Sequence, residues 1–481
     1  MRISATSQCV LFSDVKASED TDNELYMPLS TMTVGTSLVD QSITTKLIDA
    51  QVDKDWRRHL AEQLKTAFIF GVSSLTGPSI WAVLEAIRIC RETRPDISIV
   101  WGGYHATLVF DAILKEGLVD YVVRGAGEHA MLQLCQWLIE TKGEARPHLS
   151  IPGVAFIDND CLVAPEPARL LDINSLPPLN YDLIDVPQYF GQDRKSIEYI
   201  SSYGCPHECT FCVEPGHTGR KWRGLDPARV VNEVSHLFFK YQPDLIGFQD
   251  PSFCSSPKRV AGIVEEMESR GLSIPMSVDL RARDIVRLSR LIDLRRFRAV
   301  GFKHTFLGIE SGSNRVLEQL KKQMTAAEAY EAARGLSDAG VTVAMSFIHD
   351  LPNESEEDSE QTFALIWKLC QLKNVRQLHH FYMPYPFTEL SLSNIDRDRQ
   401  RSQEEWARTS TYSFETESQA RQQFRRKVVK RLMELQKEYP EAIHPSKIPT
   451  YGLNEAKDTR TACQPFWQWF EGAPYQASNV A

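Results

Sequence analysis

The residues with the clearest capacity for chemistry are three cysteines on one short stretch, Cys205, Cys209 and Cys212. The chain has ten cysteines, and the other seven are dispersed. Three thiolates so close together can bind three irons of a 4Fe-4S cube and leave the fourth iron without a protein ligand. That open iron can chelate the amino and carboxylate groups of a methionine-like cofactor, and a cluster of low potential can pass an electron to its sulfonium group. The spacing therefore predicts reductive iron-sulfur chemistry.

Two other interpretations of these cysteines stay open. A structural zinc site needs four nitrogen or sulfur ligands, which His207 and His217 could complete. Buried cysteines without a function are the second alternative. Disulfides are not expected, because the N-terminal residues lack the apolar core of a secretory signal and the chain is therefore expected to be cytoplasmic.

The first 150 residues show strand-like apolar runs that alternate with helical patterns. The expected strands are residues 9–12, 44–48, 67–72, 97–101 and 121–123. A helix is expected over residues 79–91, where apolar residues recur at helical spacing. Strand-helix alternation of this kind predicts a Rossmann-like domain with a parallel sheet, whose ligands bind at the loops that follow the strands.

Two of those loops are rich in glycine and hydroxyl groups. Ser73, Ser74 and Thr76 follow the third expected strand, and Gly102 and Gly103 follow the fourth. One interpretation is a bed for a large cofactor, lined by backbone and hydroxyl groups. The other is a pair of tight turns that only reverse the chain.

The rest of the chain divides into three regions. Residues 151–195 contain several prolines and are expected to be a linker. Residues 196–395 resume the alternation with six expected strands, which predict a partial barrel whose active groups lie at the C-terminal ends of the strands. These strands are residues 197–203, 245–249, 275–280, 305–309, 341–348 and 378–383. Residues 396–481 are expected to form a short, mostly helical region that caps the barrel, with a helix around residues 415–438.

Helix boundaries in the second half carry recognisable end signals. Asp226 and Pro227 are expected as the N-cap and first residue of one helix. A second helix is expected over residues 326–339, ended by Gly340.

Composition limits the classes of partner. A formal net charge of -9 and a pI near 5.8 argue against a nucleic acid bound on a basic face. The basic stretch 421–431 is expected to be the solvated face of a helix. No apolar run approaches the roughly 18 residues of a membrane span, so neither a nucleic-acid nor a membrane partner is expected.

The cysteine loop resembles the one that defines the radical S-adenosylmethionine (SAM) superfamily, in which an aromatic residue, here Phe211, precedes the last cysteine. The resemblance continues in residues 306–312, 346–357 and 382–390, which are similar to segments of the family's barrel. Residues 102–107 and 119–128 resemble the cobalamin-binding domain that precedes many of these barrels. Together the similarities cover about residues 1–395. They imply a cobalamin-binding Rossmann-like domain, a partial (β/α)6 barrel, and 4Fe-4S, SAM and cobalamin as cofactors.

The sequence departs from the family at two places. His349-Asp350 stands where the family usually has glycine before Leu-Pro, which puts backbone contacts to the adenine in doubt. The Asp-x-His-x-x-Gly loop that supplies a histidine to cobalt in other cobalamin enzymes is absent. His105 could replace that ligand, but a polar loop residue with satisfied hydrogen bonds is the preferred interpretation.

Residues at the ends of expected barrel strands are candidates for binding SAM. Gln249 and Asp250 could accept from its ammonium group, or cap a strand. Arg281 could pair with its carboxylate, or form a surface ion pair. Glu310 could accept from its ribose hydroxyls or ammonium, since a buried carboxylate is costly without a task. Phe211 could pack beside the adenine or belong to the barrel core.

The resemblance implies that SAM is cleaved to a 5'-deoxyadenosyl radical and that a substrate carbon receives a methyl group from cobalamin. The predicted function is accordingly methylation of a carbon centre in a small molecule, by analogy an intermediate of a secondary metabolite, with an electron donor such as flavodoxin or ferredoxin. A cobalamin-dependent cyclase or ring-rearranging enzyme is the first alternative, and a non-catalytic cofactor-binding sensor is the second. Tyr382 and Tyr385 could face the substrate. Methylthio transfer is disfavoured, because Cys9, Cys90 and Cys135 are too dispersed to bind a second cluster.

Overall fold

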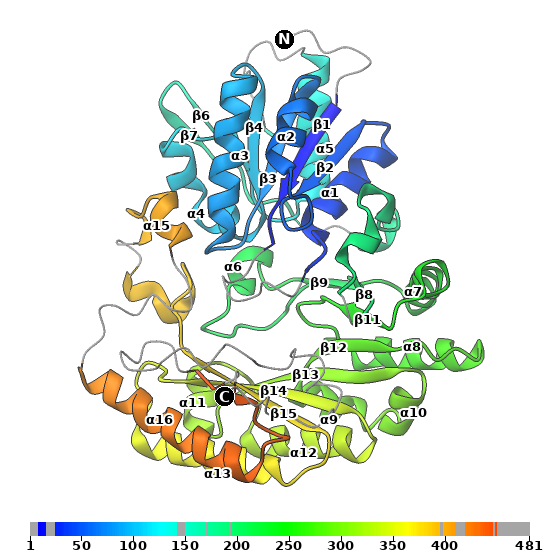
Figure 1. Cartoon of the computed structure of the whole chain (residues 1–481), viewed down its shortest axis with the longest axis vertical. Helices are drawn as coiled ribbons and strands as arrows, with labels where there is room; N and C mark the ends of the chain where they lie inside the picture. The colour runs from blue at the N-terminus through cyan, green and yellow to red at the C-terminus, as the bar shows by residue number, and fades with distance from the viewer. Residues whose placement is uncertain are drawn as a thin grey trace, which may run out of the picture. The chain divides into compact units, whose positions relative to one another are not determined.

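The structure of the protein is a computed structural model (Figure 1). It describes residues 8–15, 25–141, 150–169, 172–191, 194–394, 398–408, 419–445 and 448–449. The chain forms two compact units, and each is described by itself. The first unit comprises residues 1–205, 212–223 and 385–410, and the second comprises residues 206–211, 224–384 and 411–481.

The first unit is built on a seven-stranded sheet with the order β2-β1-β3-β4-β5-β6-β7. The first five strands pair in parallel, and β6 and β7 continue the sheet antiparallel. Their bounds are β1 Gln8–Ser13, β2 Thr45–Asp49, β3 Ala67–Ser73, β4 Ser98–Gly102, β5 Tyr121–Val123, β6 Val154–Asp158 and β7 Cys161–Val163. The expected Rossmann-like parallel sheet is thus confirmed. Strands β6 and β7 lie within residues 151–195, so part of the expected linker belongs to this sheet.

Helices follow the parallel strands as the apolar spacing predicts. In Figure 1, α3 lies across β3 and β4, and the expected helix 79–91 is confirmed as α3. The described helices of this unit are α1 Leu29–Asp40, α2 Trp56–Leu64, α3 Ser79–Thr93, α4 Gly103–Lys115, α5 Gly127–Glu140, α6 Glu214–Thr218 and α15 Gln403–Ala407. Short 3₁₀ turns occur at η1 Ile173–Ser175, η2 Tyr181–Leu183, η3 Val186–Tyr189 and η4 Glu389–Asn394. Strands β8 Ser196–Tyr199, β9 Ser202–Gly204 and β10 Trp222–Gly224 complete the set of elements.

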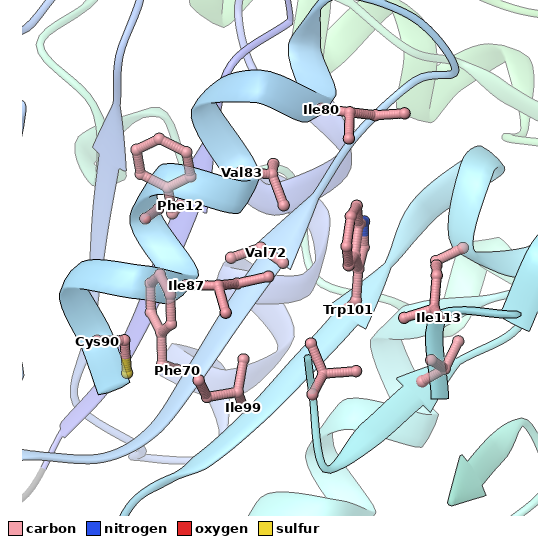
Figure 2. Close-up of a cluster of buried hydrophobic side chains, with 14 of the residues drawn as sticks. Phe12, Phe70, Val72, Ile80, Val83, Ile87, Cys90, Ile99, Trp101 and Ile113 are labelled. Carbon is pink, nitrogen blue, oxygen red and sulfur yellow. The ribbon is translucent and has the colours of Figure 1, made fainter. Parts of the chain in front are cut away.

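One core of this unit fills the space between the sheet and α3 (Figure 2). Phe12, Phe70 and Trp101 extend from β1, β3 and β4 toward Ile80 and Ile87 of α3, and all five side chains are buried. Burial of apolar surface on this scale is the main force that holds parallel strands and their helices together. The core fixes the strand ends, and therefore the loops that carry Ser73 and Gly102.

The second unit contains the parallel strands β11 to β15, and their order in its sheet is β15-β14-β13-β12-β11. Their bounds are β11 Leu245–Phe248, β12 Met276–Arg281, β13 Phe302–Glu310, β14 Thr342–His349 and β15 Val375–Phe381. Together with β8, they confirm a strand at each of the six places expected for a partial barrel. The helices are α7 Pro227–Tyr241, α8 Pro257–Ser269, α9 Ala282–Leu288, α10 Leu294–Ala299, α11 Asn314–Gln319, α12 Ala326–Asp338, α13 Glu356–Cys370 and α16 Gln419–Glu438.

The predicted helix ends agree with the structure. Asp226 is the N-cap residue of α7 and Pro227 its first residue. Helix α12 ends before Gly340, whose φ of +77° is the left-handed conformation that glycine adopts without strain. Within the residues described above, no helix is long and apolar enough to cross a membrane.

The basic stretch 421–431 is solvated in part. Arg426, Lys427 and Lys430 of α16 are exposed as expected, but Arg425 is only 1% exposed and pairs with Asp350. Long-range charge pairing buries this arginine, and helical periodicity alone does not reveal such a pair. Residues 450–481 of the expected C-terminal cap lie outside the described residues.

Candidate cofactor site

The cysteine loop begins at a glycine that no other residue could replace without strain. Gly204 ends β9 with a φ of +73°, and a Cβ atom there would lie 2.1 Å from the carbonyl oxygen of Lys221. Cys205 and Cys209 are each 9% exposed and Cys212 is partly buried; none of the three forms a disulfide. Three cysteines on one loop are a donor set that fits an iron-sulfur cluster.

Part of this loop is fixed against the end of α11 and the residues that follow it. The Thr210 amide donates to the Leu320 carbonyl at 3.1 Å, and its hydroxyl donates to the Gln319 carbonyl at 3.4 Å. Arg281, at the end of β12, donates from Nη1 to the Cys209 sulfur at 3.3 Å and from Nη2 to the Lys322 carbonyl. Arg281 thus joins the cysteine loop to the segment that carries Lys322.

A buried ion pair lies on the next strand. Glu310 ends β13 with a φ of +71° and is 6% exposed. Lys322 donates to its Oε1 at 2.9 Å and Ser346 to its Oε2 at 3.0 Å. The Lys322 ammonium also lies 5.7 Å from the centre of the Phe211 ring. Sequence reasoning identified Glu310 and Phe211 but missed Lys322, since nothing in the local pattern distinguishes it from the adjacent Lys321.

Register places several polar groups on one face of this sheet. Arg281 pairs with Gly308, and a Cβ atom at Gly308 would lie 2.8 Å from the Glu310 carboxylate. Asp279, two residues before Arg281, shares its face because side chains alternate along a strand. Asp279 is accessible to solvent, but protein atoms surround its carboxyl group closely. The lost hydration, and after it the charge of Asp250, raises the pKa of Asp279 to about 7. The alternation in β12 was the signal that could have identified Asp279.

The remaining predicted residues near this sheet follow β11. Asp250 is almost fully buried at 1% exposure, whereas Gln249 is exposed. The Gln249 Nε2 atom lies 3.7 Å from where a Cβ atom at Gly247 would be. Both residues thus lie just past the C-terminal end of a parallel strand, the position where this class of sheet binds ligands.

The five residues predicted to line a cofactor bed lie at the ends of β3 and β4 in the first unit. Gly103 has a φ of +90°, and a Cβ atom there would lie 2.6 Å from the Ser73 hydroxyl. Glycine is therefore required for the two loops to approach each other. Ser74 accepts from the Trp101 indole at 3.1 Å, so its hydroxyl also has a role inside the protein. Gly102 and Ser73 are partly accessible. A close, glycine-dependent approach of this kind leaves backbone within reach of a large ligand.

His105 lies in the first turn of α4, not in a loop as expected, and it is fully buried with both ring nitrogens paired. Its Nδ1 lies 3.0 Å from the Thr76 hydroxyl and its Nε2 lies 2.7 Å from Gln403 Oε1. Burial lowers the pKa of His105 to about 4. The interpretation of His105 as a satisfied polar residue is confirmed, and Thr76 is one of its partners.

The two histidines of the zinc alternative have separate partners. His207 lies 3.4 Å from Gln323 Oε1 and 3.8 Å from Asp284. His217 stacks on Tyr104 with 4.0 Å between ring centres. Among the described residues, no three histidine, cysteine or acidic side chains are placed to bind a single metal ion. Each histidine thus has a neighbour other than the three cysteines.

The two tyrosines suggested to face a substrate differ in exposure. Tyr382 is 7% exposed, and its amide donates to the His349 carbonyl at 2.8 Å, which extends the pairing of β14 and β15. Tyr385 is 38% exposed. The structure thus gives Tyr382 a place in the fold and leaves Tyr385 accessible.

Two domain families match this chain. The B12 binding domain matches residues 23–135, and the Radical SAM superfamily matches residues 199–366. These ranges contain the predicted cobalamin loops and the cysteine loop. The cofactors of the two domains are a 4Fe-4S cluster, SAM and cobalamin.

Curated relatives include both cyclases and methylases. The chain is 31% identical over 353 residues to the anaerobic magnesium-protoporphyrin IX monomethyl ester cyclase of Cereibacter sphaeroides. The alignment covers 71% of this chain and 56% of that protein. The chain is 24% identical over 369 residues to the hopanoid C-3 methylase of Methylococcus capsulatus, which covers 75% of this chain and 67% of that protein. The chain therefore spans a little over half the length of the Cereibacter cyclase.

Solved structures of two enzymes share the fold. The radical SAM methyltransferase TsrM from Kitasatospora setae, with cobalamin and a [4Fe-4S] cluster bound, aligns with a TM-score of 0.66 at 16% identity, over 81% of this chain and 78% of that chain. The cobalamin-dependent radical SAM enzyme OxsB aligns with a TM-score of 0.66 at 18% identity, over 90% of this chain and 62% of that chain. The chain thus combines a B12 binding domain with a Radical SAM domain, and its fold is that of solved cobalamin-dependent radical SAM enzymes.

Proposed function

We propose that this enzyme methylates a carbon centre of a small molecule, an intermediate in the biosynthesis of a secondary metabolite. The observation that carries the proposal is the contact of Arg281 with Cys209, beside the Glu310–Lys322 pair, in a chain with a B12 binding domain. A guanidinium group at this place suits the carboxylate of SAM, and the polar face on the adjoining strands offers partners for its other polar groups. The cobalamin domain adds a carrier suited to methyl transfer.

The roles of the residues follow from their positions. Cys205, Cys209 and Cys212 would hold the cluster, and Arg281 would contact it at Cys209. The polar groups of Gln249, Asp250, Arg281 and Glu310 bind SAM, and Phe211 packs against it. Cobalamin would be held by Ser73, Ser74, Thr76, Gly102 and Gly103. When bound, the cluster supplies an electron to SAM and cobalamin supplies a methyl group to the substrate.

A cyclase or ring-rearranging enzyme is the second candidate function. It is favoured by the 31% identity to a protein named as a cyclase, whereas methylation is favoured by the likeness to a hopanoid methylase and by the fold shared with TsrM. Product mass separates the two, because methylation adds one carbon and cyclisation adds none. A non-catalytic sensor would give no product at all.

The test is anaerobic reconstitution with iron, sulfide and cobalamin, followed by incubation with SAM labelled in its methyl group. We expect about four irons and one corrin per chain, release of 5'-deoxyadenosine, and a labelled product when the correct substrate is present. Replacing Cys205, Cys209 and Cys212 by alanine should abolish iron binding and 5'-deoxyadenosine release. Cys161→Ala, a change at an exposed cysteine, is the matched control and should alter neither.

The outcomes are distinct. Retention of the cluster in the triple variant would contradict the assignment of its ligands. An unlabelled product with the mass of the substrate minus hydrogen would show that the enzyme catalyses cyclisation and not methylation. We further propose a cytoplasmic location and a flavodoxin or ferredoxin as electron donor. The proposal for the electron donor is tested by asking whether such a protein reduces the cluster in place of dithionite.

A further inference from the structure

Asp350 has a backbone conformation that normally belongs to glycine. It follows β14 with a φ of +60°, and its side chain is 7% exposed. Residues other than glycine adopt this left-handed region at an energetic cost and remain there only when surrounding contacts hold them. The turn after β14 therefore keeps a glycine-like shape although an aspartate occupies it, and contacts of that aspartate must stabilise the shape.

Two arginines of α16 provide those contacts. Arg425 donates from Nε to Asp350 Oδ2 at 2.6 Å. Arg421 donates to Asp350 Oδ1 at 3.1 Å and to the Asp350 backbone carbonyl at 2.7 Å. Arg425 is 1% exposed, and its guanidinium carbon lies 4.7 Å from the centre of the Phe381 ring. Charged groups this deeply buried are stable only when paired, so the Asp350 carboxylate and Arg425 depend on each other.

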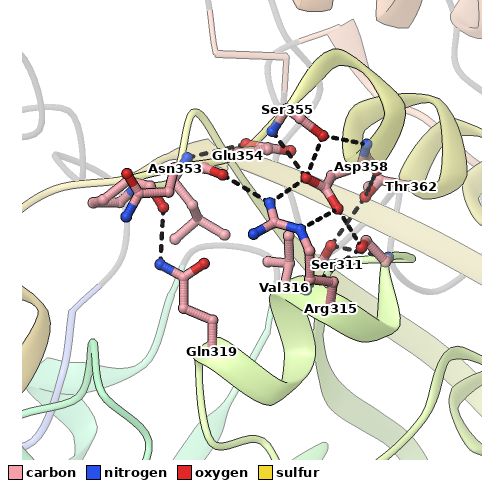
Figure 3. Close-up of polar contacts among 12 residues, drawn as sticks. Ser311, Arg315, Val316, Gln319, Asn353, Glu354, Ser355, Asp358 and Thr362 are labelled. Atoms are coloured by element: carbon pink, nitrogen blue, oxygen red, sulfur yellow. Dashed lines mark hydrogen bonds and ion pairs between the residues drawn. The ribbon is translucent and has the colours of Figure 1, made fainter.

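The same turn is tied to the segment that fixes the cysteine loop (Figure 3). The Gln319 side chain donates to the Pro352 carbonyl at 3.0 Å, and Arg315 donates to the Asn353 carbonyl at 2.7 Å. The Gln319 carbonyl in turn accepts from the Thr210 hydroxyl. A continuous series of contacts therefore runs from α16 through the turn after β14 to the residue next to Cys209.

We propose that Arg421 and Arg425 are positioning residues, which hold the turn of residues 350–353 in the conformation that completes the SAM site. The identity of the ligand, SAM, rests on the proposed function, whereas the role of the two arginines in holding the turn does not. It makes the C-terminal helix part of the frame of the site. It also explains why an aspartate can occupy a glycine-like position in this chain.

The test compares Arg425→Met with Arg431→Gln in the full-length, anaerobically reconstituted protein. Arg431 lies on the same helix and pairs with the exposed Glu360, so its variant is the matched control. A turn displaced by a fraction of an ångström should weaken SAM binding about tenfold in Arg425→Met, measured by equilibrium dialysis, with the iron content unchanged. The control should bind as the unchanged protein does. The double variant Asp350→Gly/Arg425→Met should recover most of the affinity, because glycine adopts the left-handed turn without the arginine.

Hydrogen exchange of the peptide that spans residues 350–356 gives a readout without any cofactor. Faster exchange in Arg425→Met, reversed in the double variant and absent in Arg431→Gln, is expected. Unchanged exchange and unchanged SAM affinity in Arg425→Met would overturn the inference, and so would a double variant no better than the single one. If exchange is faster in Arg425→Met but the protein without substitutions binds no SAM, the proposed function alone would be overturned.

Discussion

Lys322 is the residue whose importance was least visible before the structure. It lies between the Glu310 carboxylate and the Phe211 ring, and both members of the ion pair are less than a tenth exposed. A buried carboxylate that loses its cation keeps the desolvation cost of its charge without the compensating attraction. Lys322 is therefore expected to stabilise β13 and to balance the negative charge of Glu310 at the candidate site.

Replacing Lys322 by methionine should lower stability by about 3–5 kcal/mol, the usual cost of removing one partner of a buried pair. The measurement is the midpoint of urea-induced unfolding. Lys321→Met is the control, since its side chain is exposed and a surface change of this kind is expected to shift stability by less than about 0.5 kcal/mol. Equal effects of the two substitutions would show that the ion pair is not stabilising.

At the scale of elements, a polar network joins the turn after β13 to the start of α13 (Figure 3). Asp358 accepts from the Ser313 hydroxyl at 2.6 Å, from Arg315 Nε at 3.1 Å and from the Ser355 amide at 2.9 Å. Ser355 and Asp358 also form the capping box of α13. The network holds two strand-following turns in place at the end of the sheet that carries the candidate site.

The Asp358 network should make the second unit sensitive to acid. Arg315, followed by Ser313 and Ser355, holds the pKa of Asp358 well below its usual range. A depressed folded-state pKa contributes stability above the unfolded value near 4, and that contribution is lost as the pH falls further. Asp358→Asn should destabilise the protein by about 1–3 kcal/mol at neutral pH and flatten this acid dependence.

The measurement for Asp358→Asn is the thermal midpoint between pH 7 and pH 3. Glu357→Gln, an exposed change in the same turn of α13, serves as its control. A variant that loses stability equally at every pH would indicate that the hydrogen bonds matter and the charge does not.

At the scale of the whole molecule, each unit contains a histidine that is buried in its neutral form. Burial lowers the pKa of His105 in the first unit to about 4 and that of His349 in the second to about 3. His349 Nε2 lies 3.1 Å from Nδ1 of the equally buried His379. Since the unfolded chain binds a proton near pH 6.5 and the folded units exclude it, stability should fall as the pH drops below that value.

The expected loss is about 1.4 kcal/mol per pH unit for each such histidine, between the unfolded and the folded pKa values. His105→Gln keeps a group that can bond Thr76 and Gln403 but cannot titrate, so it should reduce the loss of stability between pH 6.5 and pH 4.5. Differential scanning calorimetry of the variant and the unchanged protein across this range is the measurement. An unchanged slope would mean that other groups dominate the acid response.

The cysteine loop, the alternation of strands and helices, and the glycines at the turns could all be predicted from the sequence, because they depend on residues close together in the chain. The sequence also located Glu310, Arg281 and Phe211 at strand and loop ends for the same reason. Folding was needed to show that Lys322 pairs with Glu310 and that β6 and β7 extend the first sheet. Long-range contacts of this kind, including the burial of Arg425 against Asp350, depend on which segments meet after folding, and local pattern carries no record of those partners.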